Sequence, residues 1–217
     1  MKELIFIICA YLIGSVPTAL IISKKFFGID IREYGSGNMG ATNTFRILGS
    51  KYGTIVMVCD ILKGIAAVAL YNFIPHYVNN GNGLDRTNFM IGLGLSAVLG
   101  HVYPIWANFK GGKGVATLCG MILAIQPVIA ISCIVVFLSV LYLTRFVSLS
   151  SILAAVMLPI SVLWIWNEHE FLYRLFALLV AIMVLITHQK NIGRLLRGAE
   201  SRIPILKFRD KRKNNHK

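Results

Sequence analysis

The stretch from Gly35 to Arg46 holds the densest group of residues that could bind an anion. Its three glycines let backbone amides turn toward a ligand without obstruction by a Cβ atom, and Arg46 adds a planar guanidinium that suits phosphate. The stretch leads into an apolar run, so its amides can also lie at a helix N-terminus. A tight surface turn without a ligand is the alternative. We expect phosphate donors from Ser36, Gly37, Asn38, Gly40, Thr42 and Asn43.

A second stretch, residues 109–117, places two lysines among three glycines before another apolar run: Lys110, Gly111, Gly112, Lys113 and Gly114. Glycine amides together with the Lys113 ammonium suit a phosphate. The pattern is not a Walker A motif, because that motif has Ser or Thr directly after its lysine. Lysines in a cytoplasmic connection can also serve only as a topology signal. The glycines around Lys113 favour an anion site.

Asp60 and Lys63 lie inside an apolar run with i, i+3 spacing, so they can pair on one helix face. Ionisable residues at membrane depth are costly and by default mark a functional site. A structural ion pair that positions helices fits the spacing equally well. Both interpretations stay open, and we treat the two residues as supporting the site.

His188 and Asn191 follow the last apolar run, again with i, i+3 spacing. A histidine can act as a base near neutral pH. A lone histidine at a helix end is often merely solvated, so this pair gains weight only beside the two glycine-rich stretches. Two further residues are expected to support the site. His101 lies in a segment whose Gly and Pro shape helix packing, and Ser150 could bind a polyol.

Seven apolar runs must position these residues: 4–24, 53–75, 88–107, 114–126, 128–144, 149–167 and 170–188. A helix needs about 20 apolar residues to cross the hydrocarbon core. The chain is 56% hydrophobic and only 14% charged, whereas a soluble domain has about 25% charged residues. We therefore predict an all-α, polytopic membrane helix bundle with about seven transmembrane helices. The fourth run is short, and re-entrant runs would reduce the count to five or six.

The distribution of basic residues predicts the orientation of this bundle. Of the 22 Lys and Arg, eighteen fall in the connections after the first, third, fifth and seventh runs, and three fall on the other side. The positive-inside rule then puts the N-terminus outside and the C-terminus in the cytoplasm. Residues 1–217 form one membrane domain with a short basic cytoplasmic tail, about 190–217. After a membrane span, such a tail meets anionic lipid rather than nucleic acid.

The remaining composition predicts no metal and no cofactor. The four cysteines are isolated in apolar runs, without a CxxC pair or Cys/His ligand spacing. The first apolar run has no cleavage site leading into a soluble protein, so we expect it to be a retained span rather than a signal peptide.

Taken together, these motifs resemble those of the bacterial acyl-phosphate-dependent glycerol-3-phosphate acyltransferase family, PlsY, over nearly the whole chain. One departure is Met39, where the family usually has proline. The resemblance rests on Gly14-Ser15-x-Pro17, Ser36-Gly37-Asn38-x-Gly40-Ala41-Thr42-Asn43, Asp60-x-x-Lys63-Gly64, Gly100-His101, Phe109-Lys110-Gly111-Gly112-Lys113-Gly114-Val115-Ala116-Thr117 and His188-x-x-Asn191-Ile192.

The resemblance implies an enzyme of phospholipid biosynthesis in the bacterial cytoplasmic membrane, with its active site facing the cytoplasm. An acyl chain would move from acyl phosphate to the 1-hydroxyl of sn-glycerol 3-phosphate, giving lysophosphatidate and phosphate. The functional positions that it implies are Ser36, Arg46, Lys113, His188 and Asn191. Because an acyl phosphate is already activated, we expect direct transfer without a covalent enzyme intermediate.

Two rival functions remain open at this point. A membrane transporter for an organic anion or phosphate ester would also use an intramembrane Asp60–Lys63 pair and glycine-broken helices. Against it, the donors cluster at one predicted surface and the sequence shows no inverted repeat. A non-catalytic membrane scaffold would not need two glycine-rich anion stretches. The acyltransferase hypothesis requires residues 35–46, 110–114 and 188–191 to converge in one pocket.

Overall fold

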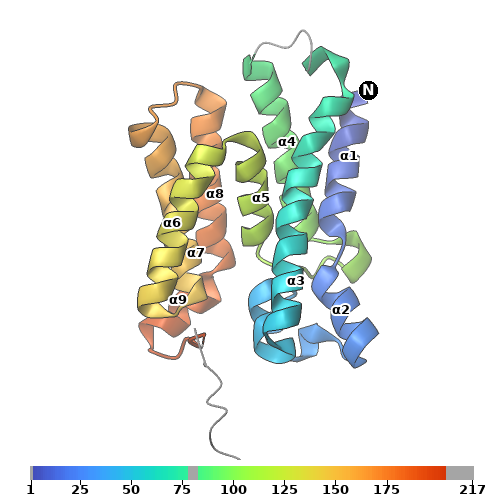
Figure 1. The fold of residues 1–217 in the computed structure, drawn as a ribbon, viewed down its shortest axis with the longest axis vertical. Coiled ribbons are helices and arrows are strands. Elements are labelled where there is room, and N and C mark those ends of the chain that lie inside the picture. The colour runs from blue at the N-terminus through green and yellow to red at the C-terminus, as the bar shows by residue number, and fades with distance from the viewer. Residues whose placement is uncertain (1, 78–82, 204–217) are drawn as a thin grey trace, which may run out of the picture.

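The computed structural model describes residues 2–77 and 83–203, and within these ranges the chain folds into helices without strands (Figure 1). Helices satisfy all backbone polar groups within one segment, as a bilayer requires. The predicted all-α membrane bundle is confirmed. Each of the seven apolar runs contains helix, but only five segments are long and apolar enough to span: Lys2–Phe27, Ala41–Phe73, Asp85–Ala107, Pro127–Thr144 and Val147–Ile165.

Two segments explain the difference from seven full spans. Helix α5, Val115–Ile125, has only 11 residues, which agrees with the short fourth run of the sequence. Helices α8, Phe171–Thr187, and α9, Gln189–Leu196, are bent by 62° and make a sixth span only if they count as one. Helix α9 also occupies the first part of the predicted tail, and residues 204–217 of that tail lie outside the described residues.

The first span is broken into two helices, α1, Lys2–Ser15, and α2, Thr18–Phe27. Pro17 causes the break because it has no N–H to donate to the helix ladder. Helix α1 packs closely on α4, Gly83–Val102, since Gly14 lies against the backbone of Ala97 and Gly100 against that of Tyr11. Small residues permit this close approach, as expected from the sequence.

Helix α3, Ala41–Ala69, continues into the 3₁₀ helix η2, Leu70–Phe73, and is kinked at Gly49, whose φ of 84° lies in the left-handed region. The kink separates the end that carries Arg46 from the membrane-crossing part. That part packs on α5, where Gly64 lies against the backbone carbonyl of Thr117. Ahead of α3, the 3₁₀ helix η1, Ile31–Glu33, leads into the first glycine-rich stretch.

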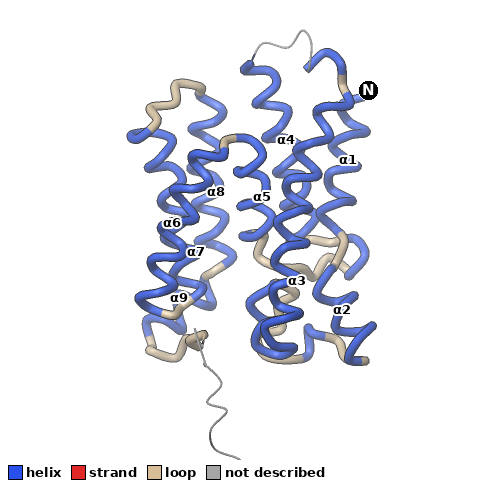
Figure 2. The backbone as a smooth tube through the Cα atoms, in the orientation of Figure 1, coloured by secondary structure: helices blue, strands red, loops and turns tan. Residues whose placement is uncertain are grey.

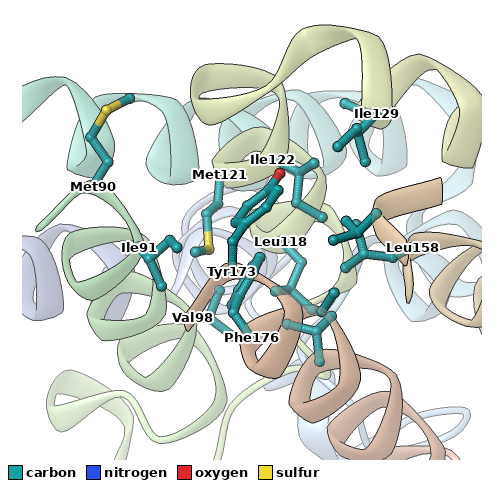
Figure 3. Close-up of a cluster of buried hydrophobic side chains, with 14 of the residues drawn as sticks. Met90, Ile91, Val98, Leu118, Met121, Ile122, Ile129, Leu158, Tyr173 and Phe176 are labelled. Carbon is teal, nitrogen blue, oxygen red and sulfur yellow. The ribbon is translucent and has the colours of Figure 1, made fainter. Parts of the chain in front are cut away.

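The second half of the chain forms α6, Pro127–Thr144, then α7, Val147–Ile160, which ends in the π-helical turn η5, Ser161–Ile165, and then α8 and α9. A buried apolar cluster joins this half to the first. Figure 3 shows Val98 of α4, Leu118 and Met121 of α5, and Phe176 of α8 in this cluster. The core therefore lies where the two halves meet around the short α5.

Most of the connections lie at one or the other end of the bundle, and the orientation of these ends across the membrane stays a prediction. In Figure 1, α2, the start of α3, the α6–α7 connection and α9 lie at one end, and the N-terminus and the α7–α8 connection lie at the other. The connection between α4 and α5 contains the 3₁₀ helix η4, Ile105–Ala107. It lies partway along the bundle rather than at its end (Figure 2). The second glycine-rich stretch is thus set into the bundle.

Candidate functional site

Lys113 comes immediately before Gly114, the residue at the start of α5, and its side chain contacts the Asn191 side-chain oxygen. Burial lowers the pKa of the Lys113 ammonium to about 8, while the charge of Glu200 acts in the opposite direction. Within residues 2–77 and 83–203 this ammonium forms no salt bridge. Lys113 is therefore a partly buried cation that an anionic ligand could neutralise.

Glu200 organises the side chains around Asn191. Its Oε1 accepts hydrogen bonds from Asn191 Nδ2 at 2.7 Å and from Ser148 Oγ at 2.9 Å. Its Oε2 accepts from Arg194 Nε at 2.6 Å. Burial raises the pKa of the Glu200 carboxyl, but these three hydrogen bonds outweigh burial and the net pKa is lowered. Glu200 thus fixes the Asn191 amide so that its oxygen faces Lys113.

His188 lies at the bend between α8 and α9 and is 3% exposed. Its Nδ1 is 2.8 Å from the Val184 carbonyl oxygen. Because a carbonyl can only accept, Nδ1 carries the proton and Nε2 of the neutral ring keeps a lone pair. His188 and Asn191 share one turn, with the Asn191 N–H donating to the His188 carbonyl at 2.8 Å. The imidazole is therefore fixed in a tautomer that can accept a proton or a ligand hydrogen bond.

The first glycine-rich stretch uses many of its own donors internally. Asn43 is 1% exposed, accepts from Ser36 N at 2.9 Å, and donates to Tyr34 O at 3.0 Å. The amides of Gly37 and Gly40 donate to Tyr34 O at 3.1 Å and to Asn38 Oδ1 at 2.8 Å.

These bonds correct part of the prediction for this stretch. Asn43 shapes the loop and is not free to donate to a phosphate, and the Gly37 and Gly40 amides are likewise engaged. The exposed hydroxyls of Ser36 and Thr42 remain, together with the first-turn amides of α3, which begins without a side-chain cap.

The stretch 35–46 reaches the second glycine-rich stretch and the segment after α9. Met39 lines a small pocket together with Pro17, His101 and Gly112. The Arg46 guanidinium donates to the side-chain oxygen of Ser201, the neighbour of Glu200. Lys113 in turn contacts Asn191. The convergence of residues 35–46, 110–114 and 188–191 in one anion-binding pocket stays a prediction.

Asp60 and Lys63 form a buried structural pair with Asp60 Oδ1 and Lys63 Nζ 2.7 Å apart. The Lys63 ammonium also donates to Val16 O at 2.5 Å, so its charge is satisfied within the bundle. His101 Nδ1 lies 3.7 Å from the same carboxylate oxygen. Of the two interpretations left open, these contacts favour the structural ion pair over a substrate contact.

The Ser150 hydroxyl is buried and donates to the carbonyl of Phe146, the residue before α7, at 2.8 Å. Ser148, two residues earlier and also buried, is the serine that contacts Glu200. The supporting role of Ser150 stays a prediction. Sequence reasoning also missed the organising role of Glu200. A signal was present, because Glu200 is the only acidic residue between His188 and Ile203.

The fold and the candidate site define an integral membrane protein of apolar helices, with the partly buried cation Lys113 beside Asn191 and the Glu200 hydrogen-bond network. The chain belongs to the glycerol-3-phosphate acyltransferase family, whose model matches residues 4–198. The glycerol-3-phosphate acyltransferase of Macrococcus caseolyticus is 41% identical over 95% of this chain and 100% of its own length. That of Staphylococcus haemolyticus is 43% identical over 94% and 98%. The family resemblance predicted from the motifs is confirmed.

Solved structures agree with this assignment. The crystal structure of PlsY, an integral membrane glycerol 3-phosphate acyltransferase, in its glycerol 3-phosphate form superposes with a TM-score of 0.82. It is 37% identical and covers 94% of this chain and 96% of that one. The lysophosphatidic acid form of PlsY gives a TM-score of 0.76 at 36% identity over the same coverage.

Proposed function

We propose that this protein transfers a fatty acyl group from acyl phosphate to the 1-hydroxyl of sn-glycerol 3-phosphate, at the cytoplasmic face of the bacterial cytoplasmic membrane. The products are lysophosphatidate and phosphate. The observation that carries the proposal is the Lys113 ammonium, which is held by Asn191 and has no carboxylate partner among the described residues. Both substrates are anionic, and one of them carries a hydrocarbon chain that suits the apolar bundle.

The chemistry needs positioning and charge stabilisation more than a covalent intermediate. The glycerol hydroxyl oxygen attacks the acyl carbon, a C–O ester bond forms, and the bond from the acyl carbon to the phosphate oxygen breaks. Lys113 and Arg46 hold the phosphates and stabilise the charge that develops on the leaving group. Bringing the two substrates together supplies much of the remaining rate enhancement.

Direct transfer agrees with the partners of the two serines that lie beside the Glu200 network, Ser148 and Ser201. Ser148 donates to Glu200, and Ser201 accepts from Arg46. Neither of these hydrogen bonds involves His188, so neither hydroxyl is paired with the imidazole as a serine nucleophile would be. The hydroxyl proton then goes either to the leaving phosphate or to Nε2 of His188.

The His188→Ala variant separates these two proton acceptors. If His188 only binds substrate, the variant keeps most of kcat with a raised KM, and the phosphate takes the proton. If His188 is the base, kcat itself falls by about 10²–10⁴. Matched thermal unfolding of the variant in detergent checks that the protein is intact.

The activity itself is tested with purified protein in detergent. The protein is supplied with labelled glycerol 3-phosphate and either an acyl phosphate or an acyl thioester. We expect labelled lysophosphatidate from acyl phosphate and none from the thioester. Equal product from the thioester would overturn the proposed donor. Uptake of glycerol 3-phosphate into proteoliposomes without any acyl transfer would replace the enzyme by a transporter.

A further inference from the structure

A buried polar cluster lies beside the α4–α5 connection, and the mechanism above does not use it. It consists of Asp60 and Lys63 from α3 and His101 from α4, whose residues are 2%, 8% and 8% exposed. Asp60 Oδ1 lies 2.7 Å from Lys63 Nζ and 3.7 Å from His101 Nδ1. One carboxylate oxygen therefore faces both the ammonium and the imidazole.

The opposite edge of the His101 ring faces the loop that carries Lys113. A side chain at Gly112 would collide with His101 Nε2, so the Gly112 backbone lies directly on the imidazole. The Gly112 N–H also donates to the His101 carbonyl at 3.1 Å. Gly111 packs on that same carbonyl and on Pro104. The residue before Lys113 is thus fixed by both the ring and the backbone of His101.

The cluster holds the break in the first span as well. The Val16 carbonyl, next to Pro17, accepts from Lys63 Nζ at 2.5 Å. Val16, Pro17, His101 and Gly112 line one small pocket. Asp60 is therefore linked to both walls of this pocket, through Lys63 on one side and through His101 on the other.

We propose that Asp60 and His101 are positioning residues for Lys113: the Asp60 carboxylate orients the His101 ring, and the ring supports Gly112 so that the lysine reaches Asn191. A ring that faces a carboxylate oxygen at 3.7 Å and is packed against a glycine backbone has little freedom to rotate, and a packed support transmits small shifts rather than absorbing them. The consequence for catalysis rests on the proposed function, whereas the placement of Lys113 does not.

The first experiment measures Lys113 without any substrate. An amine-acylating reagent is applied over a range of pH, and modification of Lys113 is followed by mass spectrometry in the wild type and in His101→Ala. With its support removed, Lys113 becomes more solvated, so we expect its apparent pKa to rise and its labelling at pH 8 to fall severalfold. Labelling that is unchanged from the wild type would overturn the proposal even if acyl transfer were never observed.

A matched control is available on the same helix. The Ser96 hydroxyl is buried and donates to Ile7 O at 2.8 Å, which joins α4 to α1 without touching the α4–α5 connection. Ser96→Ala should lower the unfolding temperature but change neither Lys113 labelling nor kcat/KM. His101→Ala should reduce kcat/KM about tenfold to a hundredfold, a loss of the order expected for a displaced charged hydrogen bond. Equal behaviour of the two variants would reduce His101 to a merely structural residue.

If His101→Ala folds poorly, a larger residue at 112 combined with a smaller one at 101 still tests the proposal. Gly112→Ala places a methyl group against the ring, so it should lower kcat/KM at least tenfold in the wild-type background. In a His101→Asn background the smaller side chain leaves room for that methyl, and the Gly112→Ala penalty should shrink. Penalties that simply add would contradict direct support of Gly112 by the ring. Lys113 labelling of the same variants shows whether the lysine moves, whatever the fate of the acyl-transfer assay.

Discussion

Among the described residues, Lys63 and Lys113 are the largely buried lysines, and their surroundings differ in one respect. Lys63 lies inside the bundle with its ammonium 2.7 Å from the Asp60 carboxylate and 2.5 Å from a backbone carbonyl. Lys113 lies in the α4–α5 connection, where a neutral amide oxygen from Asn191 is its hydrogen-bond partner. The nearest organised carboxylate, Glu200, is engaged by Ser148, Asn191 and Arg194.

The difference shows how one residue type can have its charge compensated within the fold in one place and, within residues 2–77 and 83–203, lack a carboxylate partner in another. A buried charge with its counter-ion already present stabilises the arrangement of helices and has no capacity left for a ligand. A partly buried charge whose hydrogen-bond partner is neutral remains uncompensated, and a phosphate could compensate it. Burial lowers the pKa of Lys113 to about 8, because the charged form has lost part of its solvation.

The largest effect should be a loss of stability when the Asp60–Lys63 ion pair is broken. Lys63→Met leaves the Asp60 carboxylate buried without its partner, so we expect unfolding free energy to fall by about 3–5 kcal/mol. Unfolding in detergent, followed by thermal or chemical denaturation, measures the loss. The double variant Asp60→Asn with Lys63→Met removes both charges and should recover most of the stability. A single variant as stable as the double would show that the pair is not compensated as described.

Removing Lys113, which has no carboxylate partner in the described part of the chain, should lower activity and not stability. Lys113→Ala should lower kcat/KM by about 10²–10³, the usual cost of losing one preorganised charge stabiliser. Its unfolding free energy should not fall, since no ion pair is broken and the cost of burying the ammonium is removed with it. Acyl transfer and unfolding are measured on the same preparation. A variant that unfolds readily yet keeps its turnover when folded would reverse the roles assigned to the two lysines.

The pH dependence sharpens the comparison further. The Lys113 ammonium is the form that binds phosphate, so kcat/KM should fall as pH rises through about 8. Stability should change in the other direction. Because folding lowers the pKa of Lys113 below its ordinary 10.5, the unfolded chain binds more protons between these values, and stability rises across that window. Lys113→Met should lack this rise, and Lys113→Arg should lack the alkaline fall in kcat/KM.

The smallest effect distinguishes two neighbouring serines of α7. Ser148→Ala removes a hydrogen bond to the Glu200 carboxylate and should weaken the support of Asn191. We expect kcat/KM to fall by the equivalent of at most about 1.5–3 kcal/mol, the usual contribution of a hydrogen bond to a charged group. Ser150→Ala removes only a bond to the Phe146 carbonyl within the helix and should leave kcat/KM unchanged. Equal kinetic losses in both variants would contradict the placement of Ser148 at the site.

Much of the fold was predictable because membrane helices follow local rules. Apolar runs near the length of a bilayer core predict the helices. The short α5 also followed from the short fourth run, whereas the position of the α4–α5 connection partway along the bundle did not follow from the sequence. Lys113, Arg46, His188 and Asn191 were predicted as site residues from their residue types and from the family resemblance, and their roles stay a prediction.

Tertiary structure decided which polar groups are free. Asn43 has the side chain of a phosphate donor, but its amide is consumed by Ser36, Tyr34 and Ile31. Ser148 and Ser150 look alike in sequence and both are buried, yet Ser148 donates to the distant Glu200 carboxylate and Ser150 to the nearby Phe146 carbonyl. A buried polar group forms its hydrogen bond with the partner that the fold brings within about 3 Å, and that partner can be distant in sequence. The sequence by itself therefore determined the helices and the types of chemistry available, and only the packed bundle determined which of those groups remain available to a ligand.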